Sequence, residues 1–213
     1  MPRMTRADSQ AQTRALLLAS ARKLFLRDGY NATGIAAVTE HAGFSSGAFY
    51  SNFPSKAALA LEVLQEIQTE RTKELETILR SRAADIGARI DSWSEEVLRS
   101  GWPLLELEFA LAVRGDHEFV QQEGGRHVQS VAFITKAMED FLPPELVELM
   151  PVNQVAEAVM NLVVGVAVRR IIDPKVSFAP LSELASLVSP FVGADGTAAA
   201  DSSSTGVIDL GSR

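Results

Sequence analysis

The stretch from Gly34 to Phe53 limits the fold more than any other part of this chain. Apolar residues recur at helical spacing before Gly43, which ends that helix, and Ser45 then offers a hydroxyl that can cap a second helix. The second helix is short and carries two aromatic residues four positions apart, Phe49 and Phe53. The pattern predicts a helix-turn-helix, a shape that enters the major groove of DNA.

Residues on both sides of this motif extend the pattern in order along the chain, from about residue 13 to residue 60. The positions that carry it are Leu17, Ala21, Leu24, Phe25, Gly29, Tyr30, Ala42, Gly43, Ser45, Gly47, Phe49, Tyr50, Phe53, Ser55 and Lys56. At these positions the chain resembles the N-terminal DNA-binding domain of the TetR (tetracycline-repressor) family of bacterial transcription regulators. Two positions differ from the usual pattern, because Thr39 stands where alanine is common and Ala48 where serine or threonine is frequent.

Three helix N-termini are expected to face the duplex, at Thr33, Ser45 and Ser55, because free backbone N–H groups at such an end attract phosphate. The resemblance implies that the hydroxyls of Thr33 and Tyr50 contact phosphates and that Lys56 adds a positive charge. These contacts fix register and carry no sequence information.

Base reading is expected from the exposed side of the second helix of the motif. The residues concerned are Ser45, Ser46, Gly47, Ala48 and Asn52. The first four lack the long forked side chains that discriminate bases strongly. We therefore expect specificity to depend on thymine methyl contacts, DNA shape and half-site spacing, with minor-groove contacts from Arg3 or Arg6 as an alternative.

The charge of the chain is divided unevenly. The net charge of the 213 residues is −7. Residues 1–56 carry seven basic and three acidic side chains, a balance of +4, whereas the remainder carries thirteen and twenty-four, a balance of −11. The positive charge accompanies the helix-turn-helix, and the acidic remainder is expected to face away from DNA.

The rest of the sequence predicts an all-α fold, since helical periodicity continues and no alternating strand pattern occurs. We expect a DNA-binding domain over 9–56 with its motif at about 33–53, a helical effector-binding and dimerisation domain over 57–192, and a disordered tail over 193–213. The first helix is expected to begin near Ser9 in a capping box with Gln12. Further helices are expected at 55–80, 84–100, 103–113, 116–141, 152–172 and 180–191, with a kink or break near Gly124.

The last two of these helices are apolar around much of their circumference, which indicates burial on more than one side. The resemblance implies that they form a homodimer interface. It also implies a small apolar or amphipathic effector bound in the C-terminal domain, whose binding releases a repressor from a palindromic operator. The candidate pocket residues are Trp93, Trp102, Phe109, Phe119, His127, Phe133 and Asn161.

Other classes of function have less support in the sequence. Gly43 to Gly47 matches the Gly-x-Ser-x-Gly pattern of serine hydrolases, with Ser45 as nucleophile, but that pattern requires a strand before the turn. A metal sensor would use Asp116, His117, Glu118, Glu123 and His127, of which the last two share a helix face. A regulator whose C-terminal domain binds a protein partner is a further alternative. We expect no catalytic residue and no cofactor, and a cytoplasmic protein, since no apolar run reaches the ~20 residues of a membrane span.

Overall fold

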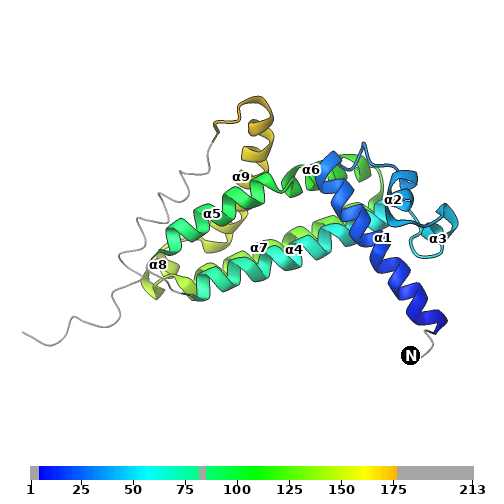
Figure 1. Cartoon of the computed structure of the whole chain (residues 1–213). Helices are drawn as coiled ribbons and strands as arrows, with labels where there is room; N and C mark the ends of the chain where they lie inside the picture. The colour runs from blue at the N-terminus through cyan, green and yellow to red at the C-terminus, as the bar shows by residue number, and fades with distance from the viewer. Residues whose placement is uncertain (1–4, 82–84, 177–213) are drawn as a thin grey trace, which may run out of the picture.

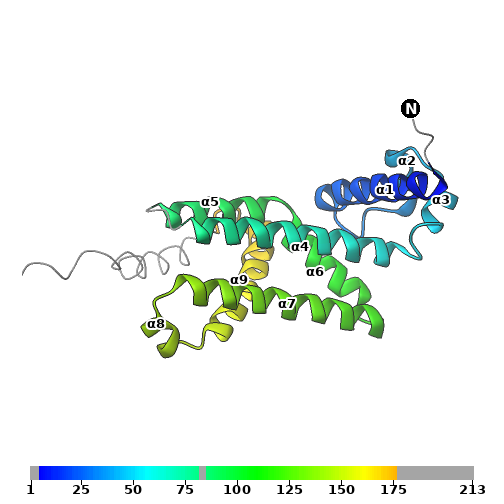
Figure 2. The ribbon, with the colours of Figure 1, turned by 90° about the horizontal axis from the view of Figure 1, so that it is seen from below.

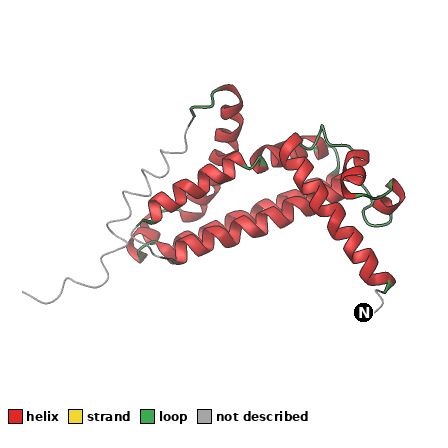
Figure 3. Cartoon of the chain, in the orientation of Figure 1, coloured by secondary structure: helices red, strands yellow, loops and turns green. Residues whose placement is uncertain are grey.

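The computed structural model describes residues 5–81 and 85–176, and this part of the chain is built from helices without a strand (Figures 1 and 3). The all-α prediction is confirmed. The helices are α1 (Arg6–Asp28), α2 (Ile35–Ala42), α3 (Ser46–Tyr50), α4 (Lys56–Arg80), α5 (Ile86–Arg99), α6 (Trp102–Val113), α7 (His117–Phe141), α8 (Pro144–Leu149) and α9 (Val152–Ile172). None of these helices is long and apolar enough to cross a membrane.

Helix α1 begins earlier than the sequence analysis expected. Its N-cap is Thr5, whose hydroxyl accepts the Asp8 N–H at 3.2 Å while the Asp8 carboxylate accepts the Thr5 N–H at 3.0 Å. The capping box expected at Ser9 is therefore wrong, because Thr5 and Asp8 supply the same reciprocal pattern one turn upstream. The expected end is confirmed, since the Gly29 N–H bonds to the Phe25 carbonyl at 2.9 Å with a φ of 88° at Gly29.

Two further expectations need correction. Helix α7 runs without a break through the exposed Gly124 and Gly125, so the break expected there is wrong. The segment after Pro143 forms α8, a helix that is not among those expected from the sequence. Pro144 occupies the first turn of that helix, where a missing N–H costs nothing. The expected helix at 180–191 and the tail lie outside the described residues.

The N-terminal three helices share one core with the start of α4. Phe25, Phe49, Phe53 and Leu59 are almost completely buried in it. Two ion pairs also join α1 to α4: Arg14 Nη2 donates to both Glu62 oxygens, and Arg22 pairs with Glu70 through both terminal nitrogens. Both pairs span 48 positions, so the two helices stay in register over two turns. They fix α4 to the unit formed by α1, α2 and α3, which is called the reading unit below.

The remaining helices extend away from this unit. Figures 1 and 2 show α4, α5 and α7 running lengthwise, with α8 at the end opposite α2 and α3. Helix α9 crosses between them and packs mainly on α7 and α6. Helix α6 lies next to the reading unit, because it packs on α1 as well as on α4.

Candidate nucleic-acid interface

The turn between α2 and α3 has the geometry that the sequence predicts. Gly43 has a φ of 76°, in the left-handed region that favours glycine, and its N–H bonds to the Glu40 carbonyl at 3.1 Å. The next N–H, that of Phe44, bonds to the Thr39 carbonyl at 2.8 Å. These two bonds end α2 and redirect the chain into α3.

Helix α3 is held by its buried face and capped by a serine. The Ser45 hydroxyl accepts the Ala48 N–H at 3.2 Å, so Ser45 is the N-cap that was predicted. Phe49 is completely buried, whereas Tyr50 is 60% exposed and meets the Phe49 ring edge-on at 5.1 Å between centroids. The core therefore fixes α3 through Phe49 and leaves the Tyr50 ring in solvent.

The predicted base-reading residues divide into two groups. Ser45, Ser46 and Gly47 are exposed and Ala48 is half-buried, so this turn of helix faces solvent. Asn52 is different, because its Nδ2 donates to the Ala48 carbonyl at 2.8 Å and its Oδ1 is buried without a partner. In this structure Asn52 closes the end of α3.

Thr33 does not have the position expected from the sequence. It is 2% exposed, and its hydroxyl donates to the Gly29 carbonyl at 2.8 Å. The N-cap of α2 is Gly34, so the expected cap at Thr33 is wrong. The backbone turns into the helix one residue later because the Thr33 side chain closes the loop that precedes it. Ser55 is the N-cap of α4 as predicted, accepting the Ala58 N–H at 3.0 Å.

Lys56 points back into the protein. Its Nζ donates to the Tyr30 carbonyl at 2.8 Å and to the Thr33 carbonyl at 3.0 Å, and lies 4.1 Å from the centroid of the Tyr30 ring. Partial burial lowers the pKa of Lys56 from its ordinary value, against the opposing effect of the nearby Glu108 carboxylate. This role could not be predicted from the sequence, because the partners are backbone carbonyls of another segment.

The seven residues predicted to line an effector pocket do not converge on one space. Trp93 borders a groove between α4 and α5, where its Nε1 donates to Glu74 at 3.0 Å. His127 borders a separate groove of about 450 Å³ between α7 and α9. Phe109 and Phe119 meet edge-on at 6.3 Å in the core, and Trp102 is buried at the start of α6. Phe133 is half-buried and Asn161 is exposed.

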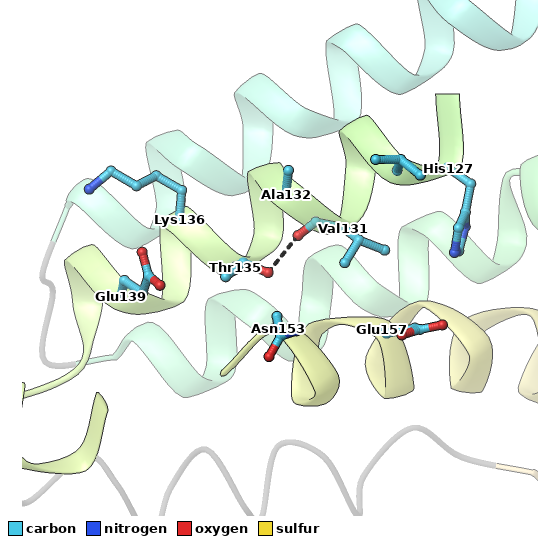
Figure 4. A pocket seen from close by; sticks show the side chains of 9 residues that line it. His127, Val131, Ala132, Thr135, Lys136, Glu139, Asn153 and Glu157 are labelled. Carbon is cyan, nitrogen blue, oxygen red and sulfur yellow. Dashed lines mark hydrogen bonds between the residues drawn. The ribbon is translucent and has the colours of Figure 1, made fainter. Parts of the chain in front are cut away.

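Figure 4 shows the groove between α7 and α9 from close by, with the side chains of His127, Val131 and Thr135 on α7 facing Asn153 and Glu157 on α9. The Thr135 hydroxyl is bonded to the Val131 carbonyl at 2.8 Å. The groove is lined by the apolar Val128, Val131 and Ala132 and by polar side chains of both helices, so its chemistry suits an amphipathic occupant.

The metal and hydrolase alternatives lack the arrangements they require. Among the described residues no three His, Cys, Asp or Glu side chains are placed to hold a metal ion, and Glu123 instead pairs with Arg126 at 2.5 Å. The turn that contains Ser45 is entered from helix α2, whereas the hydrolase pattern needs a strand there.

Comparison with known proteins agrees with the geometry of the N-terminal helices. The sequence model of the family described as "Bacterial regulatory proteins, tetR family" matches residues 17–63. The uncharacterized HTH-type transcriptional regulator YuxN of Bacillus subtilis (strain 168) is 45% identical over 49 residues. That match spans 23% of this chain and 17% of the relative, and is confined to a small part of each protein.

Solved structures show the same fold over most of the chain. E. coli NemR in its reduced form has a TM-score of 0.61 at 22% identity, with 83% of this chain and 95% of that chain covered. The regulatory protein TetR from Rhodobacter sphaeroides has a TM-score of 0.60 at 16% identity, with coverage of 84% and 97%. Residues 17–63 therefore match the TetR family of bacterial regulatory proteins, and the chain shares its overall fold with solved structures of such regulators.

Proposed function

We propose that the protein is a homodimeric repressor that binds an inverted-repeat operator and leaves it when a small amphipathic or apolar molecule binds residues 57–192. The observation that carries the DNA-binding part is the arrangement of α3. Its buried Phe49 holds the helix, and its opposite side presents Ser45, Ser46, Gly47 and Tyr50 to solvent. A helix fixed in this way can enter the major groove without reorganising the protein.

The proposed DNA contacts are of two kinds: contacts to phosphates that position the protein, and contacts to base edges that read the sequence. The exposed Tyr50 hydroxyl is a donor for a phosphate oxygen, and the N-terminus of α3 offers the backbone N–H groups of Ser46 and Gly47. Ser45, Ser46 and Ala48 are small enough for close contact with base edges and thymine methyl groups. Thr33, Asn52 and Lys56 are proposed to act mainly by holding the backbone of the motif, since each is bonded to a backbone carbonyl.

The homodimer is proposed to form through α9, together with residues 180–191. Helix α9 leaves an apolar face exposed that includes Ala158, Leu162 and Gly165, and ends in the exposed Ile171 and Ile172. A two-fold dimer would carry two reading units related by rotation, and the matching DNA is an inverted repeat.

The effector is proposed to be amphipathic because the groove between α7 and α9 mixes Val128 and Val131 with His127, Asn153 and Glu157. The same groove also supports the alternative of a protein partner, since the apolar Val128 is 65% exposed there. A ligand that enters the groove would contact α7 and α9, and α7 packs directly on α4.

Selection of bound sequences from randomised duplex DNA tests the proposal. The intact protein is compared with Tyr50→Ala and with Tyr50→Phe, which keeps the ring and removes the hydroxyl. We expect an inverted repeat with the intact protein and none with Tyr50→Ala. Recovery of a single half-site would contradict the dimeric operator, and binding without sequence preference would contradict the regulator as proposed. A screen of amphipathic compounds for release of the recovered duplex then tests the effector.

A further inference from the structure

Helix α6 touches the loop between α1 and α2 through a carboxylate. Glu108 of α6 accepts the backbone N–H of Asn31 at 3.0 Å, across 77 positions of sequence. An ionised acceptor makes this bond stronger than one between neutral groups. The bond joins α6, one of the helices of the body (α4 to α9), directly to the backbone that leads into the helix-turn-helix.

The loop is shaped to admit this carboxylate. A Cβ added at Gly29 would lie 2.7 and 2.8 Å from the two Glu108 oxygens, so a larger residue there would displace the carboxylate from this position. Gly29 also has a φ of 88°, which side chains of the L configuration rarely adopt. Both the backbone conformation and the space at this position therefore fit the approach of Glu108.

Two more contacts hold α6 to the same region. Gly101, directly before α6, lies so close to the Leu26 carbonyl that an added Cβ would be 2.5 Å from that oxygen. The Phe109 ring meets the Tyr30 ring edge-on at 5.6 Å between centroids. Helix α6 is thus fixed to the end of α1 and to the loop at three points, of which the Glu108 bond is the one that ends nearest to α2.

Lys56 is bonded to the same loop. Its Nζ donates to the carbonyls of Tyr30 and Thr33, which flank the Asn31 N–H that Glu108 accepts. The four residues from Tyr30 to Thr33 are therefore held by both a carboxylate on α6 and an ammonium at the start of α4. Helix α2 begins just after them, at Ile35.

We propose that Glu108 is a positioning residue for DNA binding, because its bond to Asn31 sets the loop that fixes the start of α2. A displacement of α6 then reaches the helix-turn-helix through this loop, in addition to any path along α4. The proposal rests on the proposed function in one respect, since it names the contact through which a ligand in the body acts on the reading unit.

The test combines hydrogen–deuterium exchange of the full chain with DNA binding. Glu108→Ala removes the acceptor, Glu108→Gln keeps an amide oxygen for the Asn31 N–H, and Glu148→Ala on α8 is a control at the far end of the molecule. We expect Glu108→Ala to speed exchange in residues 29–35 by about tenfold, as expected for one lost charge-assisted hydrogen bond. Glu108→Gln should recover most of the protection, and Glu148→Ala should leave these residues unchanged.

Binding is measured by fluorescence anisotropy with the duplex recovered from the selection. We expect Glu108→Ala to weaken it about fivefold to tenfold and Glu108→Gln less than threefold, with the same order as the exchange rates.

Three results would overturn the proposal. They are unchanged exchange in residues 29–35 of Glu108→Ala, faster exchange spread equally over α4 and α7, and unchanged affinity despite a loosened loop. The exchange arm uses no DNA, so failure of the intact protein to select any sequence would count against the proposed function and not against the Glu108 contact.

Discussion

Gln68 of α4 and Arg126 of α7 are joined by two hydrogen bonds in opposite directions. Arg126 Nη1 donates to Gln68 Oε1 at 3.0 Å, and Gln68 Nε2 donates to the Arg126 carbonyl at 3.1 Å. Gln68 also donates to the Ser130 hydroxyl at 2.6 Å, and the guanidinium pairs with Glu106 and Glu123. This buried network ties α4, which carries the reading unit, to α6 and α7.

Gln68→Ala is expected to lower the free energy of unfolding by about 1 to 3 kcal/mol, because it leaves buried polar groups of Arg126 and Ser130 without partners. Gln65→Ala is the matched control, since Gln65 lies on the same helix three positions earlier and is exposed. The control should change the free energy of unfolding by less than about 0.5 kcal/mol. Urea denaturation measures both, and equal effects of the two substitutions would contradict a stabilising role of the network.

The partly buried carboxylate of Glu106 predicts a dependence of stability on pH. Burial raises the pKa of Glu106 from its ordinary value of 4.5, against the lowering effect of Arg126. The folded protein therefore binds this proton more tightly than the unfolded chain, and the contribution of Glu106 to stability falls as the pH rises from about 4.5 through the folded-state pKa. Glu106→Gln removes this titration, so the stability of the variant relative to the wild type should increase over that range.

Thermal denaturation between pH 4 and pH 8 measures the difference between Glu106→Gln and the wild type. Glu157→Gln, on the exposed side of α9, is the control and should show a difference that varies little with pH. A difference for Glu106→Gln that stays constant across the range would show that the pKa of Glu106 is not raised.

The helices could be predicted from sequence where their signals are local. Ser45 and Ser55 cap helices by bonds to residues three positions ahead, and Gly29 and Gly43 end helices through their own backbone conformation. Such signals lie within a few residues of one another and can be recognised without a structure. The start of α1 was misplaced because Thr5 and Ser9 both have a partner of the right kind three residues later.

The contacts between distant segments could not be predicted in the same way. Lys56 binds two carbonyls about 25 positions upstream, and Glu108 binds an N–H 77 positions away. Backbone groups have no sequence signature, so nothing in the chain marks Tyr30 or Asn31 as their partners. The prediction that several aromatic residues line one effector pocket failed for a similar reason. An apolar side chain at helical spacing is compatible with either face of a packed helix, so spacing does not show which of these residues face the same space.

Substitution of the two neighbouring aromatic residues of α3 is expected to affect different properties, stability for Phe49 and DNA binding for Tyr50. Phe49→Ala removes a fully buried ring and should lower the free energy of unfolding by about 3 to 5 kcal/mol. Tyr50→Ala removes a ring that is mostly in solvent and should change it by less than about 1 kcal/mol, while weakening DNA binding. Chemical denaturation and anisotropy on the same samples separate the two effects. A large loss of stability in Tyr50→Ala would mean that its DNA-binding defect is a folding defect.

The exposed apolar face of α9 is expected to control assembly. Leu162→Glu places a charge on that face, where Leu162 is 41% exposed and its substitution leaves the core of the subunit intact. We expect the variant to be monomeric at micromolar concentration and the wild type dimeric, because burial of an unpaired carboxylate opposes association. Analytical ultracentrifugation measures this, with Glu157→Ala as a control on the same helix. A monomeric wild type would contradict the dimer.

The salt dependence of DNA binding distinguishes two roles of Lys56. A lysine that neutralises a phosphate releases a counterion, and its removal lowers the slope of log affinity against log salt by about 1. The Nζ of Lys56 is bonded to the carbonyls of Tyr30 and Thr33, so we expect Lys56→Met to weaken binding without changing that slope. The weakening would arise because the loop before α2 loses its donor. Anisotropy titrations from about 50 to 200 mM salt measure the slope. A slope reduced by one in Lys56→Met would show that the ammonium turns outward to a phosphate in the complex, as the sequence resemblance implies.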